Sequence, residues 1–187
     1  GLVDQSFSAG TQAQVQPLLQ LAQRSTNPQV RFIGMYAQVH YDAREHNWTA
    51  LTNHAEKAVH ELSVAGASHR GEDAWLAYYA AMAANSLGNF KDAENYLKKA
   101  QILGKSQGTL AATQALLGTV YLTSGRPARA LQAYAEAHNM YDLHKLKRPM
   151  WLYGQWTEAL QKLARNDEVD VVLTIQKEAV RQKLMED

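Results

Sequence analysis

Apolar residues recur along most of this chain at intervals of three and four, which is the spacing of one face of an α-helix. Trp75, Tyr78 and Met82, for example, follow one another at steps of three and four. Alanine and glutamine are frequent and runs of Val, Ile and Thr are rare, so the local preference is for helix. The pattern predicts about nine helices, at residues 12–24, 28–45, 48–63, 71–87, 90–103, 108–124, 127–144, 149–164 and 167–185.

Short links separate several of these helices. Gly88 and Gly125 stand where a helix would end in a residue with positive φ, a conformation that is easy for glycine. Pro127 then opens the next helix, where its missing N–H is harmless. Links of two or three residues force neighbouring helices to run antiparallel. A β-like run at residues 169–175 is expected to be a buried helix, because its neighbours are helical.

Two segments repeat the same order of residues. Residues 84–100 (ANSLGNFKDAENYLKKA) align with residues 121–137 (YLTSGRPARALQAYAEA) at an offset of 37. The matched pairs are Gly88 with Gly125, Ala93 with Ala130, Leu97 with Tyr134, and Ala100 with Ala137. A fixed period of this size is typical of repeat proteins, in which each unit is one helical hairpin that cannot bury its apolar face alone.

Residues 114–137 resemble the tetratricopeptide repeat (TPR), through Leu117-Gly118, Tyr121, Gly125, Ala130, Tyr134 and Ala137. Gly118 and Ala130 would let two helix backbones approach closely, beside the rings of Tyr121 and Tyr134. The resemblance is weaker over residues 74–103 and 32–62. It implies an all-α fold, a right-handed superhelical array of antiparallel helix pairs (an α-solenoid). Residues 1–187 would form one domain, with units at about 28–63, 71–103, 108–144 and 149–185.

The resemblance also implies a binding groove, because in this family the first helix of each pair lines a concave surface. The corresponding positions here are Trp75, Tyr78, Met82, Asn85, Ser86, Thr119, Leu122 and Thr123. Such an apolar and aromatic surface suits an extended peptide or an amphipathic helix. The alternative is that Trp75, Tyr78 and Met82 are core residues, buried against the preceding helix pair. Some family members clamp a peptide's terminal carboxylate with Lys, Arg and Asn, but the positions that would carry this clamp hold Tyr78, Met82, Ala115 and Thr119 here.

The composition excludes several classes of function. The formal net charge is +1, so the chain has no general attraction for nucleic acid or an anionic membrane. It has no cysteine, which excludes disulfides, thiolate metal sites and a cysteine nucleophile. No apolar run approaches the ~18 residues that would cross a bilayer, and no signal-peptide pattern opens the chain.

Candidate catalytic and metal-binding patterns are weak. Gly104-Lys105-Ser106 resembles the end of a phosphate-binding loop, but position 99 holds a lysine where that motif needs a glycine. The histidines are spaced six apart (His40 and His46, His54 and His60, His138 and His144), which puts each pair on nearly opposite helix faces. We read them as surface or capping residues. We therefore expect no cofactor, no metal ion and no enzymatic activity.

Two further kinds of partner stay open. The apolar faces of helices 149–164 and 167–185 could pair with a second chain through Trp151, Leu152, Trp156, Val171, Val172 and Ile175. A nucleic-acid-associated regulator could use the basic run that contains Lys145, Lys147 and Arg148.

The function that the sequence favours is a noncatalytic protein–protein interaction scaffold. We expect it to be one module of a larger bacterial protein, with a protein or peptide partner. The expected location is the cytoplasm, with the periplasm as the alternative.

Overall fold

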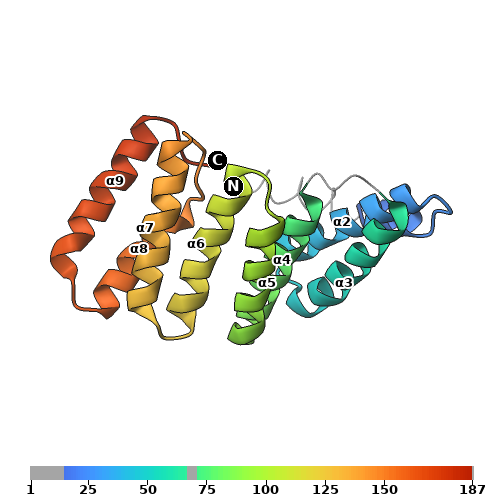
Figure 1. The fold of residues 1–187 in the computed structure, drawn as a ribbon, viewed down its shortest axis with the longest axis horizontal. Coiled ribbons are helices and arrows are strands. Elements are labelled where there is room, and N and C mark those ends of the chain that lie inside the picture. Colours follow the sequence, from blue (N-terminus) through green and yellow to red (C-terminus); the bar gives the residue numbers. More distant parts are fainter. Residues whose placement is uncertain (1–14, 67–70, 187) are drawn as a thin grey trace, which may run out of the picture.

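The computed structural model describes residues 15–66 and 71–186, and this part of the chain is all-helical (Figure 1). Residues 15–23 are helical where the description begins. They are followed by α2 (Pro28–Arg44), α3 (Trp48–Ala65), α4 (Glu72–Ser86), α5 (Phe90–Leu103), α6 (Gln107–Thr123), α7 (Pro127–Leu143), α8 (Trp151–Lys162), the 3-10 helix η1 (Asn166–Glu168) and α9 (Val169–Arg181). The predicted all-α class is confirmed, and residues 169–175 are helical as expected.

The predicted helix boundaries hold to within a few residues, except at the C-terminal end. The predicted helix 167–185 ends at Arg181, because Lys183 takes a positive φ of 57° and turns the chain. Residues 184–186 then run beside Arg148, with which Met185 forms an isolated β-bridge. Residues 12–14 and 67–70, which belong to a predicted helix and a predicted loop, lie outside the described residues.

The helices stand in one row along the long axis of the molecule, from α2 and α3 at one end to α9 at the other (Figure 1). The closest partners are α2 with α3, α4 with α5, and α6 with α7, each pair joined by a three-residue link. The first helices of successive pairs also touch, so that α4 contacts both α2 and α6, and α6 contacts α8. Within the described residues, α3 does not contact α5 and α5 does not contact α7. The first helices therefore contact one another along one side of the row, which we call the inner side, and the second helices stand apart along the opposite side, which we call the outer side.

Five links share one backbone geometry. A residue with positive φ follows the end of the helix in each, at 58° for His46, 79° for Gly88, 76° for Gly125, 50° for Lys145 and 55° for Ala164. The next residue then donates its N–H to a carbonyl five residues earlier, as in the bonds from Asn89 to Ala84 and from Arg126 to Tyr121, both 2.8 Å. This bond pairs a carbonyl that the end of the helix would otherwise leave without a donor.

One tight contact inside a pair is that of Gly118 on α6 with the ring of Tyr134 on α7. A Cβ atom added at Gly118 would lie 2.5 Å from Cε1 of the Tyr134 ring. The equivalent residues of the preceding pair are Ala81 and Leu97, both buried in the same apolar cluster. One pair thus combines no side chain with a large ring, and the other combines a methyl group with a smaller aliphatic side chain. Either combination fills the space between two helices.

Candidate binding surfaces

The residues predicted to line a concave groove lie on α4 and α6, but they are not equally accessible. Tyr78 is only 8% exposed and packs in a cluster with Leu116 and Val120 of α6. Leu122 is 6% exposed and belongs to the apolar cluster beneath α7 and α8. These two side chains are therefore part of the core. Tyr78 is buried, as in the alternative that the sequence left open, but against α6 of the following helix pair and not against the preceding pair. Trp75, Met82, Asn85 and Thr119 are partly exposed, whereas Ser86 and Thr123 are exposed.

Several predicted groove residues form hydrogen bonds between helices on the inner side. The Thr123 hydroxyl donates to Oδ1 of Asn85 at 2.6 Å, which joins α6 to α4. The Thr119 hydroxyl donates to Oε1 of Gln155 at 2.5 Å, which joins α6 to α8. The Tyr134 hydroxyl donates to the same Gln155 oxygen at 2.9 Å. These bonds hold the first helices together and occupy the polar groups that a ligand on this side would otherwise meet.

An aromatic strip lies beside them, formed by Tyr36 and His40 of α2 with Trp75 and Tyr79 of α4. We call it the inner aromatic strip. The His40 ring packs edge-on against Tyr36 and against Tyr79, with ring centroids 4.7 Å apart in both contacts. The Tyr79 hydroxyl lies 3.1 Å from Nδ1 of His40. Burial raises the pKa of Tyr36 to about 12 and lowers the pKa of His40. The sequence indicated only Trp75 of these four residues.

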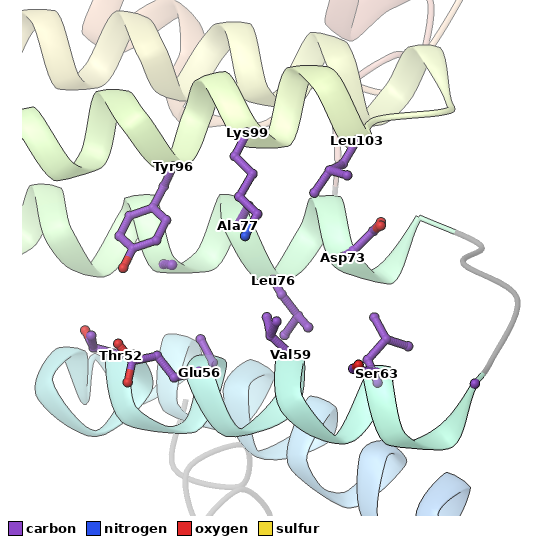
Figure 2. A pocket seen from close by; sticks show the side chains of 14 residues that line it. Thr52, Glu56, Val59, Ser63, Asp73, Leu76, Ala77, Tyr96, Lys99 and Leu103 are labelled. Atoms are coloured by element: carbon purple, nitrogen blue, oxygen red, sulfur yellow. The ribbon is translucent and has the colours of Figure 1, made fainter.

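A separate hollow opens on the outer side of the molecule, between α3 and α5, with α4 as its floor (Figure 2). We call it the outer cavity. Its volume is about 710 Å³. The walls are mostly apolar, with Ala55, Val59 and Leu62 from α3, Leu76, Ala77 and Ala80 from α4, and Leu103 from α5. Three of these residues are alanines, whose short side chains leave the space unfilled.

Charged and polar residues stand on both walls of the outer cavity. Glu56 and Thr52 come from α3, and Lys99 and Tyr96 come from α5 (Figure 2). Among the residues that the structure describes, neither Glu56 nor Lys99 has a hydrogen-bond or ion-pair partner. The cavity therefore has an apolar interior between one negatively and one positively charged wall, and Asp73 near the start of α4 adds a second carboxylate at its floor.

The neighbouring space between α5 and α7 is closed by polar bridges. Nη2 of Arg126, in the link before α7, lies 2.6 Å from Oε1 of Glu94 on α5. Gln114 of α6 accepts a hydrogen bond from Gln101 of α5 at 3.0 Å and donates one to Glu136 of α7 at 2.5 Å. No such bond joins α3 to α5 within residues 15–66 and 71–186. The outer cavity is open because this bridging is missing at the α3–α5 step.

Some of the residues that the sequence suggested for nucleic-acid binding or for self-association are buried in the core. Arg148 is 1% exposed, so it does not form a common basic surface with the exposed Lys145 and Lys147. Leu152 and Val172, which were candidates for contacts with a second chain, are buried inside this one. The other candidates are partly exposed (Trp151, Trp156 and Ile175) or exposed (Val171).

The histidines mostly have partners within the chain. Nδ1 of His54 lies 2.5 Å from Oδ2 of the buried Asp42, which joins α3 to α2. His46 lies in a turn and stacks on Trp48. In the described part of the chain, no group of three or more His, Cys, Asp or Glu is arranged to hold a metal ion. None of the described helices is both long and apolar enough to span a bilayer.

Comparisons with known proteins bear on the fold alone. A scan against protein-family models gives no match, and a search of curated proteins gives none either. Among solved structures, the chain is similar to BtubC (BKLC) from P. vanneervenii, with a TM-score of 0.69 and 15% sequence identity. The alignment covers 96% of this chain and 75% of that chain. The helical arrangement therefore recurs in another protein, at an identity too low to carry a function across.

Proposed function

We propose that this protein is a noncatalytic interaction scaffold that holds an amphipathic helix of a partner protein in the outer cavity. The observation that carries the proposal is the cavity itself, an open apolar hollow of about 710 Å³ between two helices that do not touch. Its volume lies in the range of sites that bury a ligand. Its shape is that of a groove between rods, which suits another rod.

The energetics favour a helix that brings a few large apolar side chains. The cavity is walled by Val59 and Leu62 on one side and Leu103 on the other, above the short side chains of α4. A leucine or phenylalanine transferred from water into such surroundings contributes about 1.5–3 kcal/mol. Residues spaced three or four apart on a partner helix would enter together along the floor of α4.

The two charged walls give the partner a direction. A helix in the cavity would place one flank beside Glu56 on α3 and the other beside Lys99 on α5. A basic residue on the first flank and an acidic residue on the second would be favoured, and the reversed helix would meet like charges. We therefore expect the partner helix to carry basic residues along one edge of its apolar face and acidic residues along the other.

We also propose that the helix pairs are repeats of the tetratricopeptide kind, stacked into a right-handed superhelix. The supporting observations are the shared turn geometry inside three successive pairs, at His46, Gly88 and Gly125, and the contacts between first helices on the inner side. In such an array the inner aromatic strip would face the concave side. It is the second surface on which a peptide could bind.

A peptide selection tests the proposal and separates the two surfaces. Peptides selected from a random phage-displayed library are titrated against the wild-type chain and two variants. Val59→Glu places a charge on the wall of the outer cavity, and Ser86→Glu, the matched control, places one on the inner side. Both native residues are exposed, so both variants should fold.

We expect Val59→Glu to weaken binding at least tenfold, which corresponds to ~1.4 kcal/mol, and Ser86→Glu to leave it nearly unchanged. Lys99→Glu should weaken binding less than Val59→Glu does. Replacing the acidic residues of the peptide by basic ones should restore the affinity of this variant. The proposal fails if Val59→Glu binds normally while Trp75→Ala in the inner aromatic strip does not.

Self-association is the alternative function. Leu173 and Val180 are exposed two turns apart on the same face of α9, the last helix in the row. A second copy could cover this small apolar patch. Light scattering on the purified chain distinguishes the two ideas, since a monomer at all concentrations removes this alternative and leaves the scaffold proposal intact.

A further inference from the structure

Arg148 is a buried cation whose position is fixed by its backbone. It lies between α7 and α8, and its N–H donates to the Leu184 carbonyl at 2.9 Å. The Arg148 carbonyl accepts from the N–H of Glu186 at 3.0 Å. The side chain is 1% exposed, which is rare for arginine unless the charge is fully paired.

Only one edge of the guanidinium is paired. Nη1 donates to the Tyr153 hydroxyl at 3.1 Å and lies 3.4 Å from Nδ1 of His138. Nε and Nη2 are buried and have no hydrogen-bond partner among the residues that the structure describes. The nearest carboxylate oxygen, Oδ1 of Asp142, is 3.7 Å from Nη2, which is too far for a hydrogen bond. Buried donors without acceptors destabilise a fold, so this arrangement calls for an acceptor.

The two unpaired donors form a fork. Nε–H and one N–H of Nη2 point in the same direction from the planar guanidinium, at the spacing of the two oxygens of a carboxylate. A single acceptor atom would satisfy one of them, whereas a carboxylate would satisfy both. The edge of the guanidinium that carries Nε and Nη2 therefore suits a carboxylate better than a single hydroxyl group.

Arg148 is one of the residues that line an open pocket of about 350 Å³ between α7 and α9. Lys145 and Asp142 stand on one side of this pocket, and Glu178 and Gln182 stand on the other. Glu178 is already paired with Arg181 through bonds of 2.8 Å and 2.6 Å. Asp142 is shared between two cations, at 3.5 Å from Nζ of Lys145 and 3.7 Å from Arg148. One positive charge is left without its own counter-ion.

The same residues limit the charge of the ligand. A dianion such as hydrogen phosphate would bring two negative charges toward Asp142 and Glu178, and the second charge would find no free cation in the pocket. A monoanion balances the site. We infer that the pocket beside Arg148 binds a monocarboxylate, either a small carboxylic acid or a carboxylate carried by a peptide. This site lies away from the outer cavity and does not depend on the proposed function.

Entry requires a movement of one side chain. Asp142 is 51% exposed and is the carboxylate that lies nearest to the free edge. A bound carboxylate would take the place of Asp142, whose side chain would turn to solvent while remaining close to Lys145. Replacing Asp142 by asparagine removes the competing charge and should therefore strengthen binding.

The test follows the Nε–H resonance of Arg148 in proton–nitrogen NMR spectra while sodium acetate is added, with sodium chloride at the same ionic strength as the reference. We expect acetate to shift this resonance in a saturable manner, and Asp142→Asn to tighten the apparent affinity severalfold. Sodium phosphate at the same ionic strength should have a weaker effect. Lys162→Gln, on α8 and outside the pocket, is the matched control and should behave like the wild type.

Two peptides distinguish the sources of the carboxylate. A capped pentapeptide with one central glutamate and its glutamine twin are titrated in the same way. A response to acetate alone indicates that the ligand is a small carboxylic acid. A stronger response to the glutamate peptide than to acetate indicates a peptide ligand. Either result supports the site. The inference is overturned if acetate acts like chloride in both the wild type and Asp142→Asn, or if acetate raises the Tm of Arg148→Lys in thermal unfolding as much as it raises that of the wild type.

Discussion

Replacing Gly118 by alanine adds a single methyl group at a tight contact between α6 and α7. The new Cβ atom would lie 2.5 Å and 2.6 Å from Cε1 and Cδ1 of Tyr134. Carbon atoms in contact normally stay about 3.5–4.0 Å apart, so the ring or the helix must move by about 1 Å. The ring has little room to do so, because Tyr134 is 0% exposed and its hydroxyl is bonded to Gln155.

Two effects of opposite sign set the magnitude. Alanine is favoured over glycine inside a helix by about 1 kcal/mol. Overpacking of a tight core costs about 1–3 kcal/mol, and the upper part of that range applies where the neighbour is held on all sides. The net expectation is a loss of about 1–2 kcal/mol in the free energy of unfolding. For a chain of this length that lowers Tm by about 2–8 °C.

Gly154 provides the matched control, since it also lies inside a helix and an added Cβ would meet nothing within 4 Å. Gly154→Ala should therefore raise Tm by about 1–4 °C through helix propensity alone. Thermal unfolding followed by circular dichroism measures both variants. The reasoning is refuted if Gly118→Ala is as stable as Gly154→Ala.

A second substitution tests whether the ring is the cause. Gly118→Ala combined with Tyr134→Leu recreates the Ala81 and Leu97 combination of the preceding pair. We expect the methyl group to be tolerated in the leucine background, with a coupling energy of about 1–3 kcal/mol between the two sites. Strict additivity of the two changes would place the steric conflict elsewhere.

Three further predictions concern other parts of the chain. Ala164→Gly should stabilise the fold by about 0.5–1 kcal/mol in urea unfolding, because an alanine at φ 55° is strained and glycine is not, and an unchanged or lower midpoint would contradict this. Arg126→Met should lose about 1 kcal/mol by removing the partly exposed ion pair with Glu94, and the loss should shrink in high salt, so a loss independent of salt would exclude the ion pair as its source. Burial and the charge of Arg148 hold the pKa of His138 below its ordinary 6.5, so below that pH the unfolded chain binds more protons and stability falls as the pH drops. His138→Gln should flatten this fall between about pH 6.5 and 5, measured by urea midpoints, and an equal slope in both proteins would refute the assignment.

The helices were predictable because their determinants are local. Pro28, Pro127 and the glycines at 88 and 125 mark starts and ends by the conformations that they allow. The equivalent turns at His46 and Ala164 gave no such indication. There the positive φ is imposed by the backbone bond of the following residue, and no preference of the side chain announces it.

The groove prediction shows the limit of helical periodicity. The spacing placed Trp75, Tyr78 and Met82 on one side of a helix, but it could not say whether another helix covers that side. In the structure α4 is contacted by α2, α3, α5 and α6, and Tyr78 faces α6. The outer cavity was missed for a related reason. The cavity exists because α4 has short side chains at the place where no polar bridge joins α3 to α5. Whether such a bridge forms depends on how these three helices are placed, which helical periodicity does not give.

Methyl-group NMR on the chain with a library-selected helical peptide tests the central claim most directly. The account predicts that the methyl resonances of Val59, Leu62, Leu76 and Leu103 shift together on titration, while those of Met82 stay in place. Shifts centred on Met82 and the other inner residues, with the cavity resonances unmoved, would contradict it.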